Sequence, residues 1–534
     1  MEIEDQPVDF TIDPAFILNL VLKFVLGLHA MKNFTRKDVF NIQDFIKFNS
    51  VSTDYLLKKK LEELNLAKDL DNELYEFTIN KEVGVVFKEG VSKFEEISST
   101  GMMMPLRFQI KEFLSRFGKL NEIFENMTKF SGPSAVISHY FQGSTWKAIR
   151  TYFSHESVII PIGIYTDGMQ FNNSLGKHTD STDMFYYFYP GLNDPLNRFN
   201  VHLASVIRSK FIKEYKNAKS LASLVKELYS LFMDGIDFEI EGKIVNIKFV
   251  LGLIIGDNLA LNAILDYIIG FRGNFYCRIC KVSRLDAEKL CEELISELRN
   301  RFNYEDDVNI NDPSLTGVVN NSMFNILPYF HCTLNLSLDL MHDFFEGIFQ
   351  YVICHSILYF IEKKFFTLAE LNEIINNFSY GNCNLKMTAR EAWQFLYLLP
   401  LYIGNKIDCN DEVWILLKTL LQIIELLLGS SFDEISLGEL NSLIKKHNAL
   451  YIKYFGSLKP KMHLITHLVT SIKAMGPPRH YMSLRMEMMH IYFKVYAHCT
   501  PNRKNISKSF CIKYSLYFAN LLLNGPQKLD IEYI

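Results

Sequence analysis

The sequence predicts an α/β protein in which a few buried strands are flanked by long helical regions. Two apolar runs rich in β-branched residues, near positions 160 and 250, each end on an aspartate, which is typical of a buried strand followed by a turn. Before and after them, apolar residues recur at the i, i+3, i+4 spacing of amphipathic helices. The chain has 534 residues, 49% of them hydrophobic and 22% charged, which indicates a globular protein with more than one structural unit.

Residues 1–130 are expected to form a helical N-terminal region. The runs AFILNLVLKFVLGL and DYLLKKKLEELNLAKDL carry helical spacing, and no strand run bounded by glycine is evident. The region contains no cysteine, which excludes a cysteine-ligated zinc finger there. The acidic opening MEIEDQPVDF lacks the pattern of a secretory signal, and no apolar stretch reaches the roughly 18 to 20 residues of a membrane span, so we expect an intracellular protein without membrane contact.

Residues 150–283 contain the two strands that end on aspartates. SVIIPIGIY is followed directly by Thr166 and Asp167, and the run LGLIIGD stops on Asp257. Between them, FYYFYPGLND and HLASVIRS are candidate strands, NAKSLASLVKELYSLF is a candidate helix, and the EGK sequence at 241–243 predicts a hairpin turn. If the two strands are neighbours, the carboxylates converge, although a single aspartate after a strand is usually only a turn residue.

Residues 284–455 predict an all-α block, and residues 456–525 follow it with a strongly basic segment. Between Tyr451 and Lys513 the only acidic residue is Glu487, on a predicted helix. A net charge of −4 does not indicate a nucleic-acid-binding protein, but a local cluster of basic residues can contact phosphates. The residues expected to contact DNA are Lys459, Lys461, Arg479, Arg485, Lys494, Arg503 and Lys504. The alternative is a solvated basic helix with an incidental glutamate.

Three acids in this arrangement predict a site for divalent cations. Clustered carboxylates repel one another unless cations hold them, and Mg²⁺ prefers oxygen ligands. Asp167, Asp257 and Glu487 could hold two such ions, which together support in-line phosphoryl transfer by activating the attacking oxygen and stabilising the leaving one.

A second set of residues predicts a zinc site. Cys277 and Cys280 form a CxxC pair, and His463 and His467 form an HxxxH pair that lies on one face of a helix. Together they make a candidate Cys₂His₂ site with four protein ligands and no open position, which favours a structural role. The alternative is a pair of core histidines and an unrelated CxxC.

The order of these features resembles that of DDE DNA transposases of the CACTA/EnSpm-like (CMC) group. An aspartate closes the strand in GIYTDGMQFNNSLGKHT, a second follows in LIIGDNLALN, CRIC comes twenty residues after Asp257, and HLITH precedes the acid in RMEMMHIYFK. NILPYF, LDLMHDFFEGI and FLYLLPLYIG look like further blocks of that group. The resemblance covers about residues 155–515 and extends, more distantly, to Transib transposases and the catalytic core of the V(D)J recombinase.

The resemblance implies an RNase H-like fold, interrupted before its final helix by a large all-α insertion. It implies that Asp167, Asp257 and Glu487 bind two catalytic Mg²⁺ or Mn²⁺ ions, and that the Cys₂His₂ set binds one structural Zn²⁺. The implied activity is cleavage and strand transfer of double-stranded DNA, at transposon terminal inverted repeats and target DNA, by a homodimer or higher homo-oligomer in the nucleus. The N-terminal region, a candidate for DNA binding or dimerisation, lacks a recognisable DNA-binding module, so recognition of the terminal repeats is unassigned.

Other readings of the sequence remain open. Asp339, His342 and Glu346 lie on one face of a predicted helix, where they form either a buried polar anchor or a direct part of hairpin formation or DNA binding. The whole chain could instead be a domesticated transposase-derived DNA-binding protein, a nuclease that cuts without joining, or a non-catalytic helical interaction scaffold.

Overall fold

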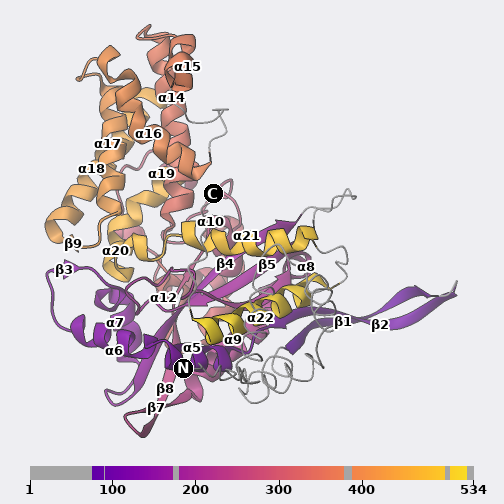
Figure 1. The fold of residues 1–534 in the computed structure, drawn as a ribbon. Coiled ribbons are helices and arrows are strands. Elements are labelled where there is room, and N and C mark those ends of the chain that lie inside the picture. The colour runs from indigo at the N-terminus through magenta and orange to yellow at the C-terminus, as the bar shows by residue number, and fades with distance from the viewer. Residues whose placement is uncertain (1–74, 89–90, 172–179, 378–387, 500–504, 526–534) are drawn as a thin grey trace, which may run out of the picture.

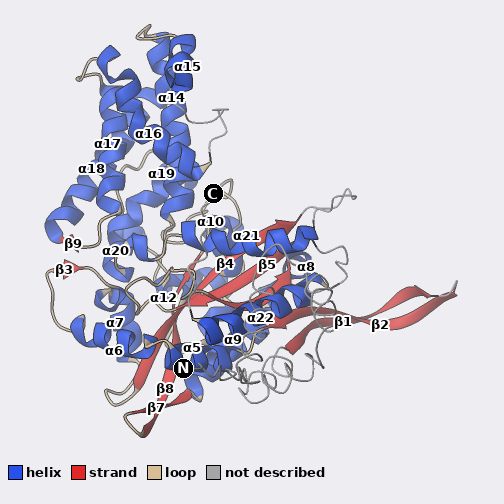
Figure 2. Ribbon diagram, viewed as in Figure 1, coloured by secondary structure: helices blue, strands red, loops and turns tan. Residues whose placement is uncertain are grey.

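The computed structural model describes residues 75–88, 91–171, 180–377, 388–499 and 505–525 (Figure 1). The two helical runs expected near residues 15–28 and 54–70 lie outside the described residues. Within the described residues the protein is mixed α/β, with a seven-stranded sheet and many helices (Figure 2).

The sheet has the strand order β1-β2-β6-β5-β4-β8-β7. β4 and β8 are parallel, and the other neighbouring strands are antiparallel. The strands are β1 Tyr75–Lys88, β2 Val91–Met103, β4 Val158–Phe171, β5 Asp180–Phe188, β6 His202–Arg208, β7 Ile236–Ile240 and β8 Lys243–Ile255. A separate two-stranded sheet pairs β3 (Val136–Ile137) with β9 (Phe432–Asp433).

The helices follow in three groups along the chain. Around the sheet-forming segments lie α5 Leu106–Arg116, α6 Lys119–Lys129, η1 Tyr140–Gln142, α7 Ser144–Thr151, α8 Ser209–Ser220, α9 Ala222–Met233 and α10 Asn258–Ile264. Next come α11 Arg284–Ala287, η2 Ile295–Glu297, α12 Arg301–Ile310, α13 Pro313–Thr316, η3 Met323–Ile326, η4 Cys332–Leu334, η5 Met341–Ile348, α14 Phe349–Glu362, α15 Leu368–Asn377, α16 Ala389–Ile403, η6 Gly404–Lys406, α17 Glu412–Leu427 and α18 Glu434–Phe455. The last are α19 Pro460–Leu464, η7 Ile465–His467, α20 Leu468–Met475, η8 Pro478–His480, α21 Leu484–Cys499 and α22 Ile506–Asn524.

The expected hairpin turn at residues 241–243 is confirmed. Ile240 pairs with Lys243, so the loop between β7 and β8 has two residues. These are Glu241 and Gly242, with φ values of 51° and 74°. Positive φ at both positions gives the backbone twist that matches two antiparallel strands. The candidate strands that became β5 and β6 and the candidate helix that became α8 and α9 are confirmed as well.

The expectation of a purely helical region at residues 1–130 is wrong for β1 and β2. Phe77 and Ile79 are buried while Glu76 and Thr78 are exposed, which is the two-residue period of a half-buried strand. β2 pairs with β1 along its length and joins β6 through Met102 and Met103. The sheet therefore extends beyond the predicted segment 150–283, and a search for helical spacing missed this edge.

Two hydrophobic cores divide the described residues. One core surrounds the sheet and includes α5, α9 and the last two helices, α21 and α22, so the C-terminal part of the chain returns to the sheet. The other is built mainly from α14, α16, α17 and α18, together with the CRIC segment and residues up to Ile472. In Figure 1 the helices α14–α18 stand together, away from the sheet.

One helical segment among the described residues, Met341–Glu362, is long and apolar enough to cross a membrane by length and composition alone. Half of its apolar window is buried inside the protein. It packs against α16, α17 and α19, and its residues belong to the second core. These contacts favour a core helix of the folded protein.

Candidate metal and nucleic-acid site

Asp167 and Asp257 both lie just beyond the point where β4 and β8 stop pairing with each other. In the parallel pair of β4 and β8, Tyr165 lies opposite Ile255, so each aspartate stands two residues beyond the last paired position. The strands stay close there, because a Cβ at Gly256 would lie 2.7 Å from the carbonyl oxygen of Thr166. The convergence of the two strand ends agrees with the expectation from the sequence.

Asp167 lies within β4 and not at its end. The predicted end of the strand at this residue is wrong, because β4 continues to Phe171 by pairing with β5, where Met184 lies opposite Asp167. Its Oδ1 accepts a hydrogen bond from the backbone N–H of Gly168 (2.7 Å). Its Oδ2 lies 3.3 Å from Nδ1 of His490, on α21. Asp167 is thus fixed by its own strand and by a helix from the far end of the chain.

Asp257 caps the N-terminus of α10. Its Oδ1 accepts a hydrogen bond from the backbone N–H of Ala260 (2.5 Å), which satisfies one of the free donors of the first helical turn. The cap fixes the aspartate where β8 ends and α10 begins. Helix capping is also a purely structural reason for an aspartate at this position. An experiment has to separate capping from metal binding.

Glu487 lies on α21, one turn before His490. Residues three apart on a helix share a face, and α21 packs on β4, so Glu487 points toward the same side as the histidine that contacts Asp167. Its Oε1 lies 3.1 Å from Nε2 of His342, and its side chain is 38% exposed. Burial raises the pKa of Tyr165 well above its usual value, and the nearby charges of Asp167 and Glu487 raise it further.

The three acids share this region without closing on a common point. Among the residues that the structure describes, one group of three or more His, Cys, Asp or Glu ligand atoms lies within 4.8 Å of one another, and it is the Cys/His set described below. Asp167 and Glu487 instead contact His490 and His342. A shared cation would therefore require Glu487 to release His342 and turn toward the aspartates.

The segment from Asp339 to Glu346 connects α21 to the second core. Met341–Ile348 is a π-helix, a form often found at functional sites. Nδ1 of His342 lies 2.5 Å from Asp339, and its Nε2 lies 4.0 Å from Glu346. The expectation that one helix face carries all three residues is wrong for Asp339, which precedes the helix and accepts a hydrogen bond from the backbone N–H of His342 (3.2 Å). Burial lowers the pKa of His342, but its contacts with Asp339 and Glu487 outweigh burial and raise it to about 11. His342 is therefore a cation that holds Glu487.

Asp339 is a buried polar anchor for the start of α21. It accepts hydrogen bonds from the backbone N–H (2.8 Å) and the hydroxyl (2.5 Å) of Ser483, whose carbonyl in turn accepts from the N–H of Glu487. Burial raises the pKa of Asp339, but its contacts with His342 and Ser483 hold it below its usual value. The roles of Ser483 and His490 were not predicted from the sequence. The only signal for either residue is the position of His490, three residues after Glu487.

Replacing Asp339 by Asn is expected to lower the free energy of unfolding by about 2 to 3 kcal/mol, because a buried charged acceptor with several donors is lost. Urea denaturation measures the free energy of unfolding of both proteins. The matched control is Glu346→Gln in the same segment, whose side chain is 42% exposed, with an expected change within about 0.5 kcal/mol. Equal stability of the two variants would contradict the anchoring role.

The four predicted zinc ligands meet in one buried cluster. The Sγ of Cys277 lies 3.6 Å from Nε2 of His467, and the Sγ of Cys280 lies 3.3 Å from Nε2 of His463. A tetrahedral zinc with bonds of about 2.3 Å to sulfur and 2.0 Å to nitrogen separates such atoms by about 3.5 Å. Donor types, burial and spacing therefore fit a zinc ion, and all four ligand positions would be filled by the protein.

The surroundings of the Cys/His cluster favour the metal-binding form at Cys277. Burial raises the pKa of the Cys277 thiol, but Cys280 and the charge of His467 lower it well below its usual value, toward the thiolate that binds metals. Contact with Cys277 and burial raise the pKa of the Cys280 thiol. Burial lowers the pKa of His467, but the charge of Cys277 outweighs burial and raises it to about 9. Both Cys280 and His467 must therefore lose a proton when zinc binds. Glu293 lies 2.7 Å from Nδ1 of His467 and also accepts from the hydroxyl of Thr470, so it orients that imidazole as outer-shell carboxylates do in zinc sites. No motif in the sequence marks Glu293.

The basic residues assigned to DNA differ in availability. Arg479, Arg485 and Lys494 are exposed, although Arg485 makes two contacts with Asp194, at 2.7 and 2.9 Å. Lys461 is partly buried and donates to the carbonyl of His342 (2.6 Å). Lys459 is partly buried and precedes α19. Arg503 and Lys504 lie outside the described residues.

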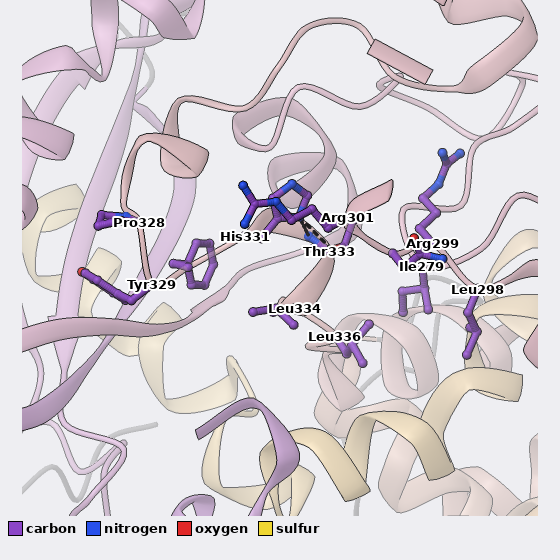
Figure 3. A pocket seen from close by; sticks show the side chains of 12 residues that line it. Ile279, Leu298, Arg299, Arg301, Pro328, Tyr329, His331, Thr333, Leu334 and Leu336 are labelled. Carbon is purple, nitrogen blue, oxygen red and sulfur yellow. Dashed lines mark hydrogen bonds between the residues drawn. The ribbon is translucent and has the colours of Figure 1, made fainter. Parts of the chain in front are cut away.

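Two pockets border the core that surrounds the sheet. One, of about 640 Å³, adjoins the candidate acids, because its lining includes Gly168, next to Asp167, and Ala263 of α10, together with Lys213 and Lys216. The other, of about 350 Å³, lies between the two cores and is lined largely by apolar side chains (Figure 3). Figure 3 shows Arg301 beside the hydrogen-bonded pair His331 and Thr333 in this second pocket.

Comparison with known proteins does not assign the chain to a family. No protein-family model matches it, and no curated protein matches it in sequence. The geometry of the acids and of the Cys/His cluster is therefore the basis for inferring a function.

Proposed function

We propose that the protein is a DDE-type DNA transposase, or is derived from one, and that it cleaves and joins DNA with two Mg²⁺ or Mn²⁺ ions held by Asp167, Asp257 and Glu487. The observation that carries this proposal is the register of β4 and β8, which brings two aspartates from distant parts of the sequence to the same end of this strand pair. α21 adds an acid from the far end of the chain to the same region. Such convergence is expected of a two-metal site.

The proposal includes an RNase H-like catalytic fold that is interrupted by an all-α insertion. Two observations support it: the sheet and α21 share one core, and the helices α14–α18 build another. The Cys/His cluster joins the CRIC segment, near the sheet, to the helices that precede α21. A structural zinc there would hold the two ends of the insertion together.

In the proposed reaction, metal ions and protein side chains would have separate roles. When bound, the divalent ions would activate the attacking oxygen and stabilise the leaving oxygen of the phosphodiester. Water is the attacking group when an element end is nicked, and the freed 3′-hydroxyl is the attacking group when that end is joined to target DNA. Arg479 and Lys494 would contact backbone phosphates, since both are exposed near α21. His490 would orient Asp167, and release of Glu487 by His342 would accompany metal binding.

The substrate determines the remaining parts of the proposal. Double-stranded DNA, as terminal inverted repeats and target, places the protein in the nucleus. Two DNA ends must be held together for joining, so at least a homodimer is expected.

Incubation of the protein with Mg²⁺ or Mn²⁺ and duplex DNA from the sequence flanking its reading frame tests the proposal. The expected products are nicks with 3′-hydroxyl ends and joined molecules, with Ca²⁺ inactive. Cleavage without joining would favour the nuclease, and binding without cleavage would favour the domesticated DNA-binding protein. Absence of both binding and cleavage with either metal would contradict the proposal in favour of the interaction scaffold.

A further inference from the structure

A buried arginine connects the Cys/His cluster to the candidate acids. Arg278 lies within the CRIC segment, between Cys277 and Cys280, and is 4% exposed. Its Nη1 donates to Oδ1 of Asn258 at 2.6 Å, and its Nη2 donates to the carbonyl oxygen of Ser337. Asn258 directly follows Asp257. One side chain therefore joins the loop that carries both cysteines to the turn that carries a candidate catalytic acid.

Asn258 passes this contact to the first turn of α10. Its Nδ2 donates to Oδ1 of Asp343 at 2.5 Å, so both ends of its amide are held by buried groups. The same turn contains the hydrogen bond from the N–H of Ala260 to Asp257. Asp257 and Asn258 share a peptide bond, so a displacement of the Asn258 backbone also displaces Asp257.

The chemistry of this contact requires arginine. A planar guanidinium reaches two acceptors at a fixed angle, whereas a lysine ammonium offers donors on a single flexible atom. Arg278 can satisfy Asn258 and Ser337 together only when the CRIC loop has its present conformation.

We propose that Arg278 is a positioning residue that couples metal binding at the Cys/His cluster to the placement of Asp257. Metal bound by Cys277 and Cys280 fixes the loop, the loop fixes the guanidinium, and the guanidinium holds Asn258 and the first turn of α10. Loss of the metal releases this turn. The consequence for catalysis rests on the proposed function, but the mechanical coupling does not.

Amide hydrogen exchange of the zinc-loaded full chain tests the coupling. In Arg278→Lys, exchange of the amides in residues 257–264 is expected to be about tenfold faster than in the wild type, with one zinc per chain retained. The matched control is Arg299→Lys. Arg299 is also buried and holds the same loop through the carbonyl of Cys277 (3.2 Å), but it pairs with Asp307 and not with Asn258. Unchanged exchange at 257–264 in zinc-bound Arg278→Lys, or equal acceleration in both variants, would overturn the proposal.

A second variant covers the case in which Arg278→Lys loses zinc or fails to fold. Asn258→Ala breaks the same contact from the α10 side and leaves the CRIC sequence intact. Removal of zinc from the wild type by a chelator is expected to accelerate exchange at 257–264, whereas removal from Asn258→Ala should add little. An equal increase in both proteins would contradict the coupling.

Mn²⁺ affinity then separates this inference from the proposed function. In zinc-loaded Arg278→Lys it is expected to fall about tenfold, as for the loss of an outer-shell partner of a metal ligand. One outcome is faster exchange in Arg278→Lys together with an Mn²⁺ affinity that Asp257→Asn does not change. This outcome would uphold the coupling and contradict the divalent-metal site. Faster exchange with Mn²⁺ affinity lowered by Asp257→Asn but unaffected by Arg278→Lys would limit Arg278 to holding α10 and overturn its role in placing Asp257.

Discussion

Replacing Asp257 by Asn is expected to lower the rate of DNA cleavage by about 10³-fold or more, which corresponds to about 4 kcal/mol of transition-state stabilisation. The substitution is informative because Asp257 has two candidate roles. As the N-cap of α10 it accepts from Ala260, and asparagine caps a helix about as well as aspartate does. As a metal ligand it must be anionic, and asparagine is neutral. The variant therefore keeps the cap and removes the charge.

The control for this experiment is Asp411→Asn. Asp411 caps α17 by accepting from the N–H groups of Val413 and Trp414 and lies in the helical unit away from the sheet. The Asp411→Asn variant should have a cleavage rate and a midpoint of thermal unfolding close to those of the wild type. If Asp257→Asn also left cleavage unchanged, Asp257 would be a cap and nothing more. Asp167→Asn, which keeps the acceptor for Gly168, should reproduce the loss of activity.

Local sequence patterns were sufficient to predict several parts of the fold. The runs that precede Asp167 and Asp257 are apolar and β-branched, and each forms part of a strand where expected, although β4 continues past Asp167 to Phe171. The two-residue turn before Lys243 carries glycine where positive φ is needed. The β1–β2 edge was missed because the expectation for residues 1–130 relied on helical spacing, whereas Phe77 and Ile79 follow a two-residue period.

The candidate site was predictable only in part, because its contacts join segments that are far apart in the chain. The four Cys and His ligands could be proposed, since each half of the cluster has a characteristic local spacing. Nothing local predicts that β4 and β8 are parallel neighbours in register, which is what aligns the two aspartates. The contacts of Glu487 with His342 and of Arg278 with Asn258 likewise depend on tertiary packing. For Asp339 the sequence left two roles open, and the buried anchor is the one that its contacts support.

Replacing Cys280 by Ala is expected to abolish zinc binding and to lower the midpoint of thermal unfolding by roughly 10 °C, if a loss of about 4 kcal/mol is spread over a unit of this size. The cluster links the CRIC segment to α19 and η7, which lie on either side of the helices α14–α18. In the metal-free variant, the thiol of Cys277 and two imidazoles would remain buried beside one another with poor hydrogen-bonding partners. Metal content measured by atomic absorption and unfolding followed by circular dichroism check the two expectations.

Cys511→Ala is the matched control, because Cys511 is also fully buried but lies in the sheet-bearing core on α22. It removes one buried sulfur and should cost stability through packing alone, with one zinc per chain retained. The decisive comparison is the effect of a chelator. Wild type and Cys511→Ala should both lose stability when zinc is withdrawn, whereas Cys280→Ala should not respond. A chelator response in Cys280→Ala equal to that of the wild type would show that the ion is bound elsewhere, and the cluster would then be a buried polar contact between two parts of the chain.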